Sequence, residues 1–279
     1  MLRLLKKPCF VFRQPEWANR FVGVLKKVVF WQPFFVFGIK KTMFYCFKDS
    51  RIFYEVEGSG TPTVFLCGWG YGSEVIKPLG RGVKGKKIFI DFPMFGKSEG
   101  LKEDWTLEDY EALVLGILKK EKIEKSGFVG HSFGGKVAIS LAGKYNICKR
   151  LVLVASAGVK PRKSLPVRLK ILRFKLAKKL GKNLEGFGSE DYKNLPQNAK
   201  KTFTNVVNCH VESTAKSISA ETLIVAGKRD KDTPLFMHKR LKSIIKNSLL
   251  LVVDAGHYVW VDAPAVKLQI SGFLNKEET

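Results

Sequence analysis

Short apolar runs alternate with amphipathic stretches from Arg51 to the C-terminus, and this order restricts the fold more than any other feature of the chain. Several runs are apolar at every position, as strands are when helices cover both faces of a parallel sheet. Strands that alternate with helices predict an α/β fold with a mostly parallel sheet and helices on both faces. The expected strands are Ile52–Val56, Val64–Cys67, Ile88–Ile90, Phe128–Val129, Leu151–Val154, Leu223–Ala226 and Leu249–Val253.

The stretches between these runs carry helix signals. Thr106 followed by Asp109 is a typical N-terminal cap, and apolar residues then recur every three or four positions as far as Lys120. The other expected helices are Ala138–Lys144, Leu235–Lys246 and Pro264–Asn275.

The alternation stops between Gly158 and Ala220, where the chain is first helical and basic and then polar. Leucines at helical spacing form a stripe there: Leu165, Leu169, Leu172, Leu176 and Leu180. An insertion with its own helices between two core strands is typical of a lid. The sequence therefore predicts an N-terminal extension at 1–42, a first core segment at 43–157, a helical lid at 158–220 and a second core segment at 221–279.

A serine stands between glycines in the stretch GHSFGG at residues 130–135, with an apolar run before it and a helical stretch after it. Glycines are needed because a tight strand-to-helix turn leaves no room for side chains beside the serine. The N-terminus of the following helix offers N–H groups to a developing oxyanion. The position of this pattern between a strand and a helix predicts that Ser132 is a nucleophile.

A serine hydroxyl needs a general base at neutral pH, and the chain has four histidines. His131 lies in the turn itself, His210 in the expected lid and His238 early in an expected helix. His257 follows an expected strand, and the carboxyl ends of parallel strands share one edge of the sheet. We therefore expect His257 to be the base.

An acid that orients the histidine is expected at the same edge. Asp230 closely follows the expected strand Leu223–Ala226, while Asp232 and Asp254 are the alternatives. We favour Asp230. The chain order serine, acid, histidine is that of α/β-hydrolases and differs from the order in chymotrypsin and subtilisin.

From about Met43 to the C-terminus, the sequence resembles the α/β-hydrolase-fold superfamily in its lidded, serine-esterase form. The resemblance lies in GHSFGG at 130–135, GKRDKDTP at 227–234, AGH at 255–257, LCGWG at 66–70 and DFPMFGKS at 91–98. It implies hydrolysis of a carboxylic ester or related small acyl compound through an acyl-serine, with no metal and no cofactor. It also implies an oxyanion hole made by the backbone N–H groups of Trp69 and Phe133.

The chain departs from the family pattern at three positions. Cys67 stands where a histidine is usual, Met94 where a glycine is usual, and Glu221 where a proline is common. None of these positions belongs to the expected catalytic residues. Cys67 and His131 are expected to line the substrate pocket.

The formal net charge of +24 is unevenly distributed. Residues 1–48 hold ten Lys and Arg against one acid, and residues 160–182 hold ten and no acid. This pattern favours anionic lipid or nucleic acid as a partner, although a lysine-rich proteome would give the same charge. The chain shows no aromatic stacking platform among the basic residues, so no specific nucleic acid is expected.

The extension 1–42 carries an apolar stripe with basic flanks, formed by Trp17, Phe21, Val24, Val28 and Trp31. Such a helix can lie in an anionic membrane interface, or it can pack on the protein's own core or on a second subunit. The longest nearly apolar run, 28–39, is too short to span a bilayer. With five scattered cysteines and no secretory signal, we expect a cytoplasmic protein, with peripheral membrane attachment as the alternative.

Two further patterns are set aside. The stretch 80–85 spells GxGxxG but precedes an expected strand instead of opening a helix, so it is interpreted as a loop. No His, Cys and carboxylate residues have metal-ligand spacing.

The competing functions are cleavage of a C–C bond, an amide or a membrane lipid by Ser132, His257 and Asp230, or a basic binding protein without catalytic activity.

Overall fold

The computed structural model describes residues 40–161 and 195–276, together with positions 172, 173, 176, 179, 180 and 192. These residues belong to one compact unit, Ile39–Thr279. The stripe expected within the extension 1–42 lies outside the described residues, as do Leu165 and Leu169 of the second stripe.

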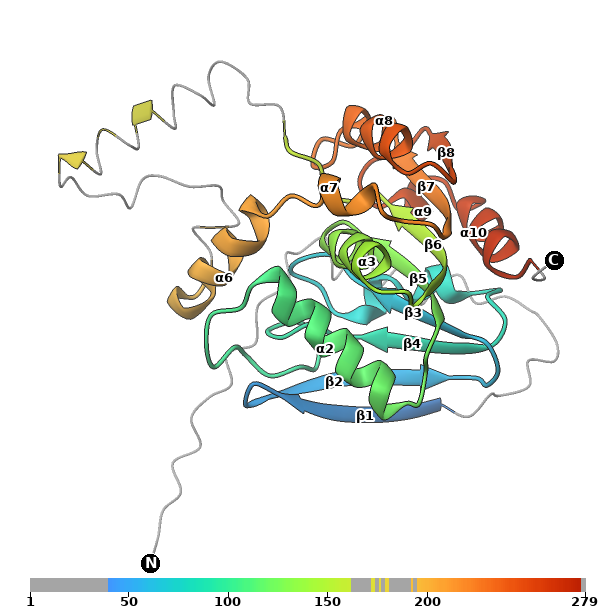
Figure 1. Ribbon diagram of the computed structural model, residues 1–279, viewed down its shortest axis with the longest axis horizontal. Coiled ribbons are helices and arrows are strands. Elements are labelled where there is room, and N and C mark those ends of the chain that lie inside the picture. The colour runs from blue at the N-terminus through green and yellow to red at the C-terminus, as the bar shows by residue number, and fades with distance from the viewer. Residues whose placement is uncertain are drawn as a thin grey trace, which may run out of the picture. The chain divides into compact units, whose positions relative to one another are not determined.

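Eight strands form one sheet in the order β1-β2-β4-β3-β5-β6-β7-β8 (Figure 1). β1 pairs with β2 and β2 with β4 in antiparallel fashion, and all the other neighbours are parallel. The strands are β1 (Lys40–Phe47), β2 (Ser50–Glu57), β3 (Pro62–Leu66), β4 (Lys86–Ile90), β5 (Ser126–His131), β6 (Cys148–Val154), β7 (Glu221–Gly227) and β8 (Ser248–Val253). The mostly parallel sheet predicted from the sequence is confirmed.

Each expected apolar run falls on one of these strands, whereas β1 was not predicted. β1 begins at Lys40, inside the stretch 1–42 that the sequence analysis set apart as an extension. Its residues alternate between exposed and half-buried, with Met43, Tyr45 and Phe47 turned toward the core. Such a strand is stabilised mainly by its pairing with β2. Its own residues therefore give only a weak sequence signal for a strand.

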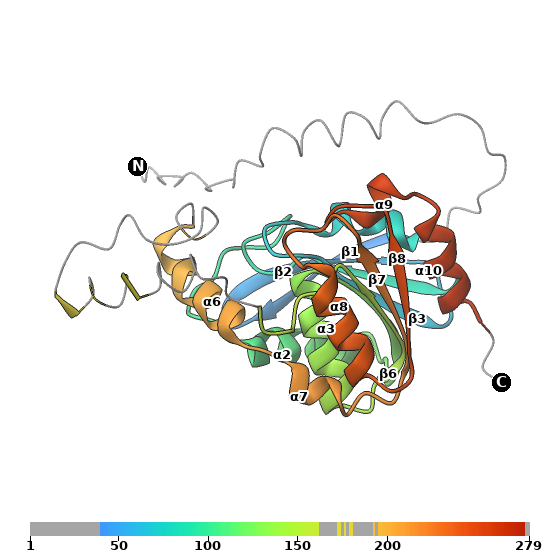
Figure 2. The same cartoon turned by 90° about the horizontal axis from the view of Figure 1, so that it is seen from above.

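Helices cover both faces of the sheet (Figure 2). One face carries α2 (Leu107–Lys120), α3 (Phe133–Lys144), α7 (Glu212–Ala215) and α8 (Leu235–Ile244). The other carries η1 (Ser73–Val75), η2 (Lys77–Gly80), α9 (Val259–Asp262) and α10 (Val266–Leu274). The helices expected in the core are thus confirmed, and the loop at 80–85 leads into β4 as expected.

The central strands are apolar at nearly every position because both their faces are buried. On β3, Val64 and Leu66 face the helices α2 and α3, while Phe65 between them faces the opposite layer. Phe128 and Val129 divide in the same way on β5. This period of two is the physical reason why the apolar runs predict a sheet with two covered faces.

The expected cap of α2 is present, since the Thr106 N–H donates to Asp109 Oδ2 at 2.7 Å. Helix α6 (Gln197–Asn208) and helix α7 lie within the stretch 158–220. The described leucines of the basic stripe, Leu172, Leu176 and Leu180, are exposed. The action of this stretch as a lid stays a prediction. In the described part of the chain, no helix combines the length and apolarity that crossing a membrane requires.

Candidate active site

Ser132 occupies a strained turn between β5 and α3. Its φ of 51° and ψ of −115° lie outside the usual regions for a side-chain-bearing residue. All residues of β5 are buried, whereas Ser132 is partly exposed, so the turn lifts the hydroxyl off the end of the strand. Strain of this kind persists only where the surrounding structure enforces it.

The glycines on either side of Ser132 allow the surrounding backbone to hold this strained turn in place. A Cβ on Gly134 would lie 2.1 Å from the Leu66 carbonyl oxygen, and one on Gly130 would lie 2.5 Å from the Gly135 Cα. Both obstacles are backbone atoms, which cannot move aside as a flexible side chain can. The glycines are therefore required by close contact between β3, β5 and α3.

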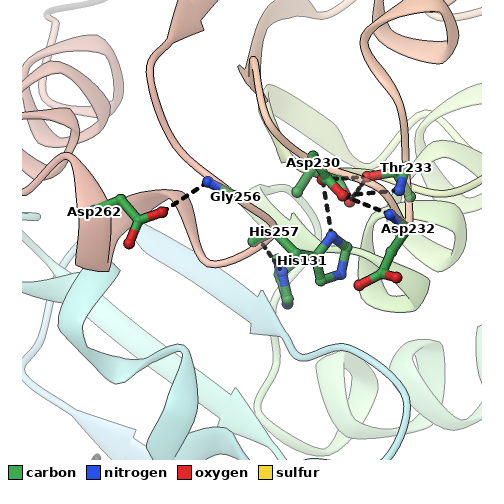
Figure 3. Close-up of polar contacts among 8 residues, drawn as sticks. His131, Asp230, Asp232, Thr233, Gly256, His257 and Asp262 are labelled. Atoms are coloured by element: carbon green, nitrogen blue, oxygen red, sulfur yellow. Dashed lines mark hydrogen bonds and ion pairs between the residues drawn. The ribbon is translucent and has the colours of Figure 1, made fainter.

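His257 and Asp230 come together at the same edge of the sheet, after β8 and β7 respectively. His257 Nδ1 lies 2.9 Å from Asp230 Oδ2 (Figure 3). The His257 side chain is 13% exposed and that of Asp230 is fully buried. Because Nδ1 faces the carboxylate, Nε2 is the ring nitrogen that can exchange a proton with a substrate or nucleophile.

Asp230 is held by a turn of its own. Its Oδ1 accepts hydrogen bonds from the Asp232 N–H at 2.9 Å and the Thr233 N–H at 3.0 Å, and its Oδ2 accepts one from Thr233 Oγ1 at 2.8 Å. Burial by itself would raise the pKa of Asp230, but the hydrogen bonds and the charge of His257 outweigh it and lower that pKa. The carboxyl is thus kept ionised. Thr233 was not identified from the sequence, although a hydroxyl three residues after an acid is a readable turn signal.

Asp230, Asp232 and His257 also offer three ligand atoms within 4.8 Å of one another, a set that sequence spacing did not reveal. Both oxygens of Asp230 already accept hydrogen bonds, and Nδ1 of His257 is one of their partners. A cation would compete with these bonds for the same lone pairs. The arrangement therefore fits a hydrogen-bonded acid–histidine pair better than a metal centre.

The loop 67–70 passes close to the turn that carries Ser132. A Cβ on Gly68 would lie 3.2 Å from the Ser132 Cβ and 3.1 Å from His131 Nδ1. Phe133 is the first residue of α3, where helical geometry leaves the N–H groups without partners inside the helix. Trp69 and Phe133 also touch through their rings, with centroids 5.6 Å apart. Trp69 and Phe133, the residues expected to supply oxyanion donors, therefore lie close to the turn that carries Ser132.

Aromatic side chains surround Trp69. Its ring makes edge contacts with Phe95 at 5.1 Å and with Phe203 at 5.3 Å, in addition to Phe133. Phe203 lies on α6 and was not identified from the sequence. The same helix is tied to the core by the buried Lys136, whose Nζ donates to the Val206 carbonyl at 2.5 Å. Helix α6 thus places an aromatic ring over the loop 67–70.

The remaining sequence candidates lie as follows. Cys67 is buried, and burial raises the pKa of its thiol to about 12, so the thiol stays protonated. His131 is 1% exposed, and its ring lies against that of His257 with centroids 4.7 Å apart. Asp254, an alternative acid, is exposed and pairs with Arg229 at 2.9 Å.

The two other positions that depart from the family pattern are Met94 and Glu221. Met94 adopts a φ of 74°, a conformation that glycine reaches without strain. Glu221 opens β7 and forms ion pairs with Lys276 at 3.1 Å and Arg150 at 3.6 Å. Met94 therefore adds local strain near the site, while Glu221 lies in the sheet at the opposite end of β7.

Residues 63–268 match the model of the Alpha/beta hydrolase family. The chain is 28% identical over 265 residues to a 2-hydroxy-6-oxononadienedioate/2-hydroxy-6-oxononatrienedioate hydrolase of Pseudomonas putida, covering 81% of this chain and 92% of that protein. It is 26% identical over 205 residues to the uncharacterized hydrolase YugF of Bacillus subtilis, covering 63% of this chain and 75% of that protein.

Solved structures of similar fold include an esterase from Exiguobacterium antarcticum, with a TM-score of 0.67 at 19% identity, covering 85% of this chain and 100% of that one. An enol-lactonase from Burkholderia xenovorans LB400 has a TM-score of 0.67 at 18% identity, covering 84% of this chain and 100% of that one. These likenesses concern the fold.

Proposed function

Since the chain belongs to the alpha/beta hydrolase family and is an enzyme, we propose that it is a serine hydrolase that cleaves a carboxylic ester or a related acyl compound through an acyl-serine. The observation that carries the proposal is the 2.9 Å hydrogen bond between His257 Nδ1 and Asp230 Oδ2, at the sheet edge where the turn of Ser132 ends β5. An acid that holds Nδ1 leaves Nε2 as base for the hydroxyl.

In the first half of the reaction, the Ser132 oxygen attacks the substrate carbonyl while its proton passes to His257 Nε2. The negative charge that develops on the carbonyl oxygen is stabilised by the N–H groups of Trp69 and Phe133. His257, now positive, is stabilised by Asp230. The tetrahedral intermediate then expels the alcohol, which takes the proton from His257.

In the second half, water attacks the acyl group on Ser132. His257 accepts a proton from this water and returns one to the serine oxygen when the carboxylic acid leaves. The Asp230 carboxylate stays ionised throughout, which agrees with its lowered pKa. No step in this scheme uses a metal or a cofactor.

The surroundings of Trp69 favour an uncharged acyl group. Phe95, Phe133 and Phe203 are the rings that contact it, and aromatic surfaces stabilise apolar groups that leave water. A short or medium aliphatic or aromatic acyl ester fits this environment. An acyl group that ends in a carboxylate would lose its hydration against these rings without gaining a partner from them.

The similarity to the Pseudomonas putida hydrolase favours a second candidate, the cleavage of a carbon–carbon bond beside a ketone by the same three residues. The two candidates differ in the leaving group and share the base and the oxyanion donors. An assay with a 2-hydroxy-6-oxodienoate, in which the loss of the substrate's absorbance measures turnover, distinguishes the two candidates. A rate above that of the best ester would make carbon–carbon cleavage the main activity.

The direct test replaces the nucleophile. We expect Ser132→Ala to abolish both hydrolysis of p-nitrophenyl butyrate and labelling by a fluorophosphonate probe. Ser217→Ala is the matched control, because Ser217 is an exposed serine of the described chain and should leave both signals unchanged. Labelling or turnover that persists in Ser132→Ala would contradict the proposal.

A further inference from the structure

His131, the residue before the nucleophile, is bonded to the segment that carries the base. Its Nε2 lies 3.2 Å from the backbone carbonyl oxygen of His257, across 126 residues of sequence. Its ring also packs against Tyr258 at 5.4 Å and against the edge of Trp260 at 4.9 Å. Figure 3 shows His131 beside His257, with Asp230 on the far side of the His257 ring.

The tautomer of His131 follows from these contacts. A carbonyl oxygen can only accept, so Nε2 must carry the proton and donate it. Nδ1 is then unprotonated, and it is buried without a hydrogen-bond partner among the described residues. It faces the loop 67–70, where a Cβ on Gly68 would come within 3.1 Å of it.

His131 stays neutral at physiological pH. Burial, together with the nearby charge of His257, lowers its pKa to about 3. A neutral ring can lie beside His257 while His257 gains and loses its proton, because no like charge opposes the charged form. His131 therefore does not compete with His257 for the proton of Ser132.

We propose that His131 is a positioning residue that fixes the backbone of His257 and so sets the direction of the His257 ring toward Ser132. The inference rests on the proposed function of Ser132 and His257. Asp230 holds His257 at one ring nitrogen, which leaves the ring free to swing about that bond. A second anchor at the backbone carbonyl fixes the point from which the side chain departs, and residue 131 can supply it because it is joined directly to Ser132.

Two variants separate the hydrogen bond from the volume of the side chain. His131→Phe keeps a planar ring and loses the donor, and we expect kcat for p-nitrophenyl butyrate to fall about tenfold with KM changed less than about twofold. His131→Gln keeps an N–H donor, and we expect kcat to return to within about threefold of the wild type. Phe89→Leu, a buried change in the apolar layer that Trp260 also joins, controls for a general loss of stability.

A second readout does not depend on turnover. In the NMR spectrum, the low-field proton on Nδ1 of His257 should be broadened in His131→Phe and sharp in both His131→Gln and Phe89→Leu. In the wild type, the nitrogen shifts of His131 should show the Nε2–H tautomer without titration between about pH 5 and pH 9. This last measurement needs no variant and stands even if His131→Phe fails to fold.

The proposal is overturned by an Nδ1–H tautomer of His131, or by kcat in His131→Phe equal to that of the wild type. It is also overturned if Phe89→Leu lowers kcat as much as His131→Phe while the low-field signal stays unchanged in both. Failure of the proposed function looks different, since Ser132→Ala would then retain activity whatever the state of His131.

Discussion

His257 and Asp230 stand 27 residues apart in the chain and are joined by a 2.9 Å hydrogen bond between Nδ1 and Oδ2. Each follows a strand, and β7 and β8 pair in parallel from Thr222 opposite Ser248 to Gly227 opposite Val253. The register of the two strands therefore brings their carboxyl ends level. The pair is a direct consequence of how the sheet is assembled.

Replacing Asp230 tests whether this acid orients the His257 ring. Asp230→Asn leaves the shape of the side chain but removes its charge, so His257 loses the partner that fixes its tautomer; we expect kcat to fall about 10³–10⁴-fold. Asp232→Asn tests the alternative acid and should change kcat less than about threefold, because the Asp232 contact to Asp230 is made by its backbone N–H. Steady-state kinetics on p-nitrophenyl butyrate measure both. The reverse ranking would assign the role to Asp232.

Gly134→Ala should distort the turn that carries Ser132. The added Cβ would meet the Leu66 carbonyl oxygen at 2.1 Å, and the backbone must shift to relieve the clash. We expect the free energy of unfolding to fall by about 2–3 kcal/mol and fluorophosphonate labelling to be lost. Gly100→Ala, where nothing lies within 4 Å of the added Cβ, should stay within about 0.5 kcal/mol of the wild type in urea denaturation. Equal stability of both variants would contradict the required close contact.

Phe203→Ala should widen the space over the loop 67–70. The Phe203 ring lies 5.3 Å from that of Trp69, so its removal frees apolar volume beside the proposed oxyanion donor. We expect the ratio of kcat/KM for hexanoate to that for acetate esters to rise about tenfold, since the space left by the ring would hold about one or two of the four extra methylenes of hexanoate, and burying that many gains about this much in an apolar site. Val207→Ala, an exposed neighbour on α6, should leave the ratio unchanged. A chain-length profile that does not move in Phe203→Ala would place the acyl group elsewhere.

A buried histidine on α8 should make folding sensitive to acid. Burial lowers the pKa of His238 to about 4, whereas in the unfolded chain it lies near 6.5. Between these values the unfolded chain binds a proton that the folded chain does not, so stability is present above about pH 6.5 and is lost as the pH falls toward 4. His131 acts with the same sign.

In His238→Leu, the loss of stability between about pH 7 and about pH 4.5 should be smaller than in the wild type by roughly 2 kcal/mol. Urea midpoints at the two pH values measure it. An equal loss in both proteins would mean that His238 is not protonated differently in the folded and unfolded states.

The strands and the turn between β5 and α3 at Ser132 could be predicted because their signals are local. The apolar run Leu223–Ala226 and the glycine pattern around Ser132 each span only a few residues of sequence, although the contact that requires Gly134 comes from Leu66 on β3. β1 has no such signal, since it is a half-buried strand that depends on its partner β2. The short helix α9 (Val259–Asp262) has too few residues to show a helical period.

The same distinction holds at the site. The proximity of Asp230 and His257 could be predicted because each follows the carboxyl end of a strand, and parallel strands end at one edge of the sheet. The bond between His131 and the His257 carbonyl joins β5 to the loop after β8, and neither sequence segment specifies the other. Phe203 reaches Trp69 from α6 in the same unpredictable way. Contacts between distant segments arise only from the assembled fold.

Two of the three strands that carry the site, β5 and β8, have different places in the sheet. β5 lies in the middle and is buried throughout, whereas β8 ends the strand order and leaves Leu249 57% and Val252 40% exposed. Outer strands open at a lower free-energy cost than inner ones. On gentle heating, β8, the strand before His257, should therefore unfold locally while β5, the strand before Ser132, stays folded. Enzyme activity should be lost at a lower temperature than the overall secondary structure. Amide hydrogen exchange should be faster in β8 than in β5.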